Sequence, residues 1–137
     1  MNQMNQSDFD DLLQAARAQA EPQRLLFVFA QAVLPDDCSD AQRAAFAAGD
    51  GGALAPLMSV DKTPAELAGF AALAAESQAL SAGWVAVFVA SLGGRGGSAP
   101  TTTETARALE QMIDAVGNGR FGTMLAFNRE GGILSFA

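Results

Sequence analysis

The stretch WVAVFVASLGGRGGSAPTTTET, from Trp84 to Thr105, decides the fold that we expect for this chain. Its first residues are rich in β-branched and aromatic side chains, which predicts a strand over Trp84–Ala90 at the centre of a sheet. Four glycines around Arg95 then form a loop. Thr101, with Glu104 three residues later, is typical of a helix start with a capping box. The order strand, glycine-rich loop, helix is common in α/β proteins, and its backbone N–H groups can converge on an anion.

Helix signals also lie outside this stretch. An apolar pattern at helical spacing follows Ser7 and predicts a first helix that ends before Pro22. The quartet Thr63–Glu66 combines an N-cap, a proline at the first helical position and a capping-box glutamate. It predicts a helix that runs to about Gln78. A shorter helix is expected after Ser39.

Apolar runs predict the remaining strands. The run Leu25–Phe29 is continuous, which is typical of a strand covered on both faces. The run Ala53–Val60 contains Pro56, which favours a sheet edge or a bulge. The runs Phe121–Phe127 and Ile133–Phe136 are joined by a glycine-containing turn and predict a C-terminal hairpin.

Together these elements predict a single-domain α/β (or α+β) sandwich over residues 1–137, around a mixed sheet of about five strands. Because helices lie between consecutive strands, part of the sheet is expected to be parallel, with right-handed crossovers. The hairpin adds an antiparallel pair. We expect the final strand at a sheet edge, where apolar side chains favour pairing with a second copy, so a homodimer is predicted.

The overall charge and the apolar pattern exclude several classes of partner. The 137 residues hold 15 acidic and 8 basic side chains, a net charge of −7, which disfavours nucleic acid. No apolar run reaches the roughly 18 residues of a membrane span, and the sequence opens without a signal-peptide pattern. A single cysteine, Cys38, fits a reducing compartment. We expect a cytoplasmic protein that binds neither nucleic acid nor membranes.

The residues that most enzymes use are missing from the sequence. It has no histidine and no tyrosine, so the commonest general base and the Ser-His-Asp and Cys-His pairs are absent. One cysteine cannot close a zinc site of His and Cys ligands. The acidic segment Asp36–Asp40 lacks the glycine and final glutamate of a calcium loop and is interpreted as an acidic turn. We therefore predict no catalytic residue, metal or cofactor, and favour a non-catalytic interaction or regulatory module over an enzyme.

The glycine-rich loop carries the alternative hypothesis, a binder of a small anionic metabolite between Gly93 and Thr103. In that interpretation the loop N–H groups and the Arg95 guanidinium hold the anion. The loop lacks the Gly-Lys-Ser/Thr ending of a Walker A motif, and a plain solvated turn is the competing interpretation. The predicted ligand-binding residues are Gly94, Arg95, Gly96, Gly97, Ser98, Thr101, Thr102 and Thr103.

Four segments resemble a family of small bacterial proteins often labelled "ribonucleotide reductase subunit alpha": EPQRLLFVFAQAVLPDD, GGALAPLMSVDKTPAEL, VFVASLGGRGGSAPT and GRFGTMLAFNREG. The resemblance covers most of the chain and implies, as a further alternative, an accessory subunit related to that label. Catalytic alpha subunits of that enzyme use several cysteines in a far larger barrel, so no catalytic residue carries over to this chain with its one cysteine. The segment Leu57–Leu67, a strand followed by a proline-entered helix, is also similar to domains of the enhanced-serine-sensitivity type.

Overall fold

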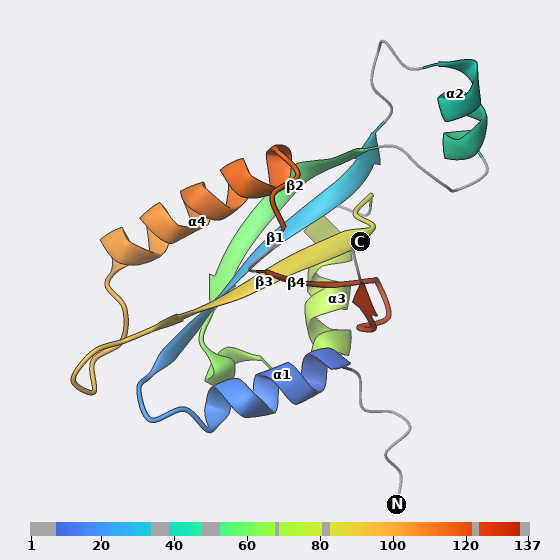
Figure 1. Ribbon diagram of the computed structural model, residues 1–137. Coiled ribbons are helices and arrows are strands. Elements are labelled where there is room, and N and C mark those ends of the chain that lie inside the picture. Colours follow the sequence, from blue (N-terminus) through green and yellow to red (C-terminus); the bar gives the residue numbers. More distant parts are fainter. Residues whose placement is uncertain are drawn as a thin grey trace, which may run out of the picture.

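The fold is that of a computed structural model, which describes residues 8–33, 39–47, 53–67, 69–80, 83–121 and 124–134. Figure 1 shows one sheet between two helical layers, with α4 on one face and α1 and α3 on the other. The elements in chain order are α1 (Asp8–Arg17), β1 (Gln23–Val33), α2 (Asp40–Ala47), β2 (Ala53–Lys62), the 3₁₀ turn η2 (Pro64–Glu66), α3 (Phe70–Leu80), β3 (Ala86–Gly93), α4 (Thr102–Gly117), β4 (Leu125–Phe127) and β5 (Ile133–Leu134).

The sheet has five strands in the order β2-β1-β3-β4-β5. The predicted sandwich of helices around about five strands, with a C-terminal hairpin, is confirmed. The expected parallel pairing is corrected, because every described pairing is antiparallel. β2 and β3 lie on opposite sides of β1 and therefore run in the same direction without touching. The helix α3 connects β2 to β3, so the expected crossover is present. The two strands that it joins are not neighbours, because the antiparallel strand β1 lies between them.

The two faces of β1 supply two separate cores. Leu25, Phe27 and Phe29 pack under α1 and α3, whereas Leu26 and Val28 pack under α4. Because both sets are buried, the strand is apolar without alternation. The prediction of a strand covered on both faces is thus confirmed.

The predicted central strand is the third of the five strands. It begins at Ala86, two residues later than expected, so Trp84 lies just before it. The Trp84 side chain is fully buried, packs edge-on against Phe29 at 5.1 Å, and has the Arg129 guanidinium 5.6 Å from its ring centre.

Both edges of the sheet carry features that limit backbone pairing with other chains. On β2, Pro56 lies opposite Ala30, next to a register shift between Phe29 and Ala30. Pro56 therefore marks both an edge strand and a bulge, as its position in the sequence predicts. At the other edge, β5 covers Ile133–Leu134 of the predicted strand, whose residues 135 and 136 lie outside the described part of the chain, and the Ile133 N–H donates to the Asp8 carboxylate at 3.0 Å. The last strand is an edge strand as expected, but α1 already satisfies that N–H.

The helix signals are confirmed at two of three starts that the structure describes. The Thr101 hydroxyl accepts the Glu104 N–H at 3.1 Å, and the Glu104 carboxylate accepts the Thr101 N–H at 2.9 Å. Ser39 and Gln42 form the same reciprocal pair ahead of α2. The third start, at Thr63, gives only the 3₁₀ turn η2. Ser7 lies outside the described residues.

The helix predicted to be continuous from Thr63 is broken before α3 begins. Leu67 is extended, with φ −101° and ψ 126°, and Gly69 has a φ of +147°. The helix starts again at Phe70, whose N–H donates to the Asp10 carboxylate of α1 at 3.0 Å. The cap of α3 therefore comes from a different helix rather than from its own preceding residues.

Candidate functional site

The glycine-rich loop folds as a tight two-residue hairpin. Arg95 and Ser98 exchange backbone hydrogen bonds in both directions at 2.9 Å. Gly96 and Gly97, between them, have φ values of +58° and +82°. Positive φ at both central residues is the geometry of a type I′ turn, which explains why two glycines occupy these positions.

The donors of this hairpin are directed at acceptors of the protein itself. The Gly94 N–H donates to the Pro22 carbonyl at 2.8 Å, and the Gly97 N–H donates to the Glu21 carboxylate at 2.7 Å. The Arg95 side chain, 82% exposed, forms an ion pair with Glu104. The structure thus brings residues 94–98 together, but carboxylates of this chain already contact the Gly97 N–H and the Arg95 guanidinium. Binding of a metabolite anion at this loop stays a prediction, and such an anion would compete with Glu21 and Glu104.

The Glu104 carboxylate, at the start of α4, contacts both the Thr101 N–H and the Arg95 guanidinium. The backbone N–H of Thr101 is the main cause that lowers the pKa of Glu104 below its ordinary value of 4.5, and the Arg95 charge acts in the same direction. The Thr63 N–H lowers the pKa of Glu66 in the same way at η2. In both cases the largest cause is the hydrogen bond that caps the following turn, which stabilises the fold.

We expect Glu104→Gln to lower stability at neutral pH and to lose that effect in acid. The folded-state pKa of Glu104 is depressed, so its ionised form stabilises the fold above the unfolded value near 4.5. This stabilisation disappears as the pH falls through the folded pKa. Denaturant unfolding of both proteins across the acid range measures it, and the two curves should converge at low pH. Glu110→Gln, an exposed change on the same helix, is the control, and an equal pH effect there would contradict the assignment.

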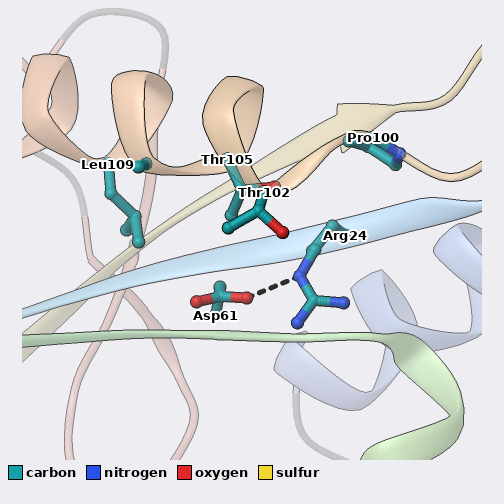
Figure 2. Close-up of a pocket in the computed structure, with 7 residues that line it drawn as sticks. Arg24, Asp61, Pro100, Thr102, Thr105 and Leu109 are labelled. Carbon is teal, nitrogen blue, oxygen red and sulfur yellow. Dashed lines mark hydrogen bonds and ion pairs between the residues drawn. The ribbon is translucent and has the colours of Figure 1, made fainter.

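A second polar site lies under the first turns of α4. Figure 2 shows the Arg24 and Asp61 side chains facing each other beneath Thr102, with Leu109 farther along the helix. The Arg24 Nε lies 2.5 Å from the Asp61 Oδ2, and both side chains are about 30% exposed, at 31% and 29%. A cavity of about 280 Å³ opens above this pair. Its lining residues are Arg24, Asp61, Pro100, Thr102, Thr105, Ala106 and Leu109.

Thr102 is the one residue that the sequence prediction and this cavity share. Thr101 and Thr103 flank it at the helix start, and the hairpin residues do not line the cavity. Sequence reasoning missed Arg24 and Asp61, which stand on separate strands and become neighbours only through the β1–β2 register. The available signal was that Arg24 directly precedes one apolar run and Asp61 directly follows the other. Antiparallel pairing of the two runs places these residues at the same end of the ladder.

Other classes of site find no support in the described residues. They contain no group of three or more His, Cys, Asp or Glu side chains placed to hold a metal ion. Residues 36–38, with the acidic turn and the cysteine of the sequence prediction, lie outside the described part of the chain. None of the helices in that part combines the length and apolar character that crossing a bilayer requires.

Comparison of the chain with protein-family models, with curated proteins and with solved structures finds no match. The resemblance to the proteins labelled "ribonucleotide reductase subunit alpha" therefore stays a prediction.

Proposed function

We propose that this protein is a non-catalytic, cytoplasmic interaction module that associates with a second copy of itself along the outer edge of β2. One observation carries the proposal: β2 is a ten-residue edge strand flanked on both faces by exposed apolar side chains. The surface comprises the outward backbone of β2 with Ile113 of α4 and Leu80 of α3, and we call it the β2 edge surface. The absence of histidine and tyrosine from the whole sequence supports the non-catalytic part.

The backbone direction along β2 follows from one hydrogen bond of the neighbouring ladder. The Gly94 N–H donates to Pro22, and bonding directions alternate along antiparallel strands, so even-numbered β1 residues face β3 and odd-numbered ones face β2. In the register that pairs Phe27 with Val60, the backbone groups of Ser59 and Asp61 then point away from the sheet. These groups have no strand partner among the described residues and can pair with another strand.

The exposed side chain above this edge belongs to α4. Ile113 is 36% exposed. It lies one helical turn after Leu109, which lines the cavity with Asp61, and one turn before Gly117, where an added side-chain carbon would meet the Pro56 ring at 3.8 Å. Since residues four apart share a helix face, Ile113 lies on the β2 side of α4.

A matching side chain lies on the opposite face of the sheet. Leu80, at the end of α3, is 68% exposed and lines a small hollow together with Met58 and Val60 of β2. The Lys62 and Glu76 side chains form an ion pair at 3.1 Å between the same two elements. Each face of the sheet therefore has one exposed apolar side chain beside β2, namely Ile113 on the α4 face and Leu80 on the α3 face.

A second copy fits this surface better than an unrelated strand does. Antiparallel pairing of β2 with its own copy around a twofold axis normal to the sheet keeps equivalent faces aligned. Helix α4 then lies beside α4 of the copy, and α3 beside α3, so Ile113 and Leu80 meet their equivalents. Pro56 and the bulge confine pairing to the second half of β2. At β5, by contrast, the Ile133 N–H already donates to the Asp8 carboxylate. We therefore propose the dimer contact at β2 and not at the final strand, where the sequence led us to expect it.

We expect Ile113→Asp to convert the dimer into a monomer while the fold stays intact. Two aspartates would face each other across the twofold axis, and like charges at an interface cost several kcal/mol, so the dissociation constant should rise about 100-fold or more. Sedimentation equilibrium over a range of protein concentrations measures the change, and circular dichroism checks the fold. Leu80→Asp tests the opposite face in the same way.

Leu125→Asp and Ile133→Asp are the matched controls, because both residues are similarly exposed, at 43% and 55%, but lie at the β4–β5 edge. They should leave the dimer unchanged. A parent protein that stays monomeric at every concentration would refute self-association. Dissociation by Ile133→Asp, with no effect of Ile113→Asp, would place the contact at β5 instead.

A further inference from the structure

We propose that the cavity above the Arg24–Asp61 pair binds a small zwitterion, namely an α-amino acid with a short aliphatic side chain. The proposal does not depend on self-association. It starts from the cavity of about 280 Å³ between α4 and the β1–β2 ladder. Both signs of charge stand on one side of this cavity, with apolar side chains on the other (Figure 2).

The ion pair leaves polar atoms of both partners available. Arg24 contacts Asp61 through Nε and Oδ2. The two Nη atoms of Arg24 and the Oδ1 atom of Asp61 take part in none of the described hydrogen bonds. A ligand carboxylate can bind the two Nη atoms, and a ligand ammonium group can bind Oδ1.

The charge balance selects a zwitterion over a simple anion or cation. The Arg24 charge is already compensated by Asp61, and Glu66 lies close enough for its pKa to be lowered further by Arg24. A lone carboxylate ligand would be repelled by Asp61, and a lone ammonium ligand by Arg24. A ligand that carries both charges satisfies both groups and leaves the net charge of the site unchanged.

The remaining lining residues limit the rest of the ligand. Pro100, Ala106 and Leu109 provide an apolar wall opposite the ion pair. The Thr105 hydroxyl already donates to the Thr101 carbonyl at 2.9 Å, so Thr102 offers the available hydroxyl. Such a wall suits a short hydrocarbon side chain better than a polar one.

Three probes of nearly equal shape test the charge requirement by isothermal titration calorimetry on the full chain. L-valine carries both charges, isovalerate lacks the ammonium group, and isobutylamine lacks the carboxylate. We expect saturable binding of L-valine, and binding of each single-charge analogue weaker by about tenfold or more, since hydrogen bonds to charged groups contribute that much. L-Alanine and L-leucine bracket the size of the side chain.

Three variants place the binding at the cavity. Asp61→Asn and Arg24→Gln each remove one charge and should weaken L-valine binding about tenfold or more. Ala106→Leu fills the cavity without touching the ion pair and should abolish binding, and its exposed helical position lets the protein fold normally. Arg120→Gln breaks an exposed ion pair with Asp114 at the far end of α4 and should leave binding unchanged.

The following results would overturn the proposal. The first is the absence of saturable binding for all three amino acids at about 10 mM, a concentration that fills even a millimolar site. The second is equal binding of isovalerate and L-valine, which would indicate a simple anion site. The third is unchanged L-valine binding by a folded Ala106→Leu variant, which would place the ligand elsewhere.

Discussion

Replacing Phe9 with alanine is expected to lower the free energy of unfolding by about 3–5 kcal/mol, the range measured for a buried phenylalanine lost from a core. The Phe9 side chain is fully buried and joins three elements to α1. Its ring centre lies 6.0 Å from that of Phe27, 5.2 Å from Phe70 and 5.4 Å from Phe127. The substitution removes all three aromatic contacts at once and leaves a cavity where α1, β1, α3 and β4 meet.

Urea denaturation measures this loss, and the fluorescence of Trp84, the single tryptophan, provides the signal. The matched control is Gln14→Ala on the exposed side of α1, where a change within about 0.5 kcal/mol is expected. A loss below about 1 kcal/mol for Phe9→Ala would be too small for a filled core position and would contradict the described packing of α1.

Gly94→Ala is expected to cost about 2–3 kcal/mol, toward the upper end of the range for overpacking. A Cβ atom at Gly94 would lie 1.8 Å from the carbonyl oxygen of Ser98, far inside any allowed contact. Because the clash is with backbone, the return strand of the hairpin must shift. That shift would break the paired hydrogen bonds between Arg95 and Ser98.

Two other glycines make a graded series with Gly94. At Gly83 an added Cβ has no atom within 4 Å, so Gly83→Ala should be nearly neutral. Gly96 has open space but a φ of +58°, so Gly96→Ala should cost about 1–2 kcal/mol from backbone strain alone. Thermal unfolding monitored by circular dichroism ranks the three variants. An alanine at position 94 that is tolerated as well as one at position 83 would show that the hairpin is not closed as described.

Local chemistry made the helix starts predictable where the cap lies next to the helix. Thr101 and Glu104 satisfy each other's backbone within one turn, so sequence alone locates the start of α4. The same signal at Thr63 is real, yet it closes only a 3₁₀ turn, because Gly69 adopts a φ of +147° and redirects the chain. The true start of α3 uses Asp10, 60 positions away, and no local pattern reveals that partner.

Strand pairing and the cavity depended on long-range register, which the sequence could not supply. Helical segments between strands predicted parallel crossovers, but α2 lies at the far end of the β1–β2 pair and does not cover the sheet, so β2 returns beside β1 as in a hairpin (Figure 1). Arg24 and Asp61 become neighbours only through that return. The glycine-rich loop was recognisable as a turn, whereas the destinations of its N–H groups, at Pro22 and Glu21, were not.

The contact between α1 and the β4–β5 turn also determines when this protein can finish folding during synthesis. Asp8 accepts the N–H of Ile133, 125 positions later in the chain, and the Phe9 N–H donates to the Gly131 carbonyl. A ribosome adds about 5–20 residues per second, so α1 emerges many seconds before the segment on which it docks. Until residues 131–133 have left the exit tunnel, α1 can pack against Phe27 and Phe70 but lacks these two hydrogen bonds, so the docking of α1 is completed late in synthesis.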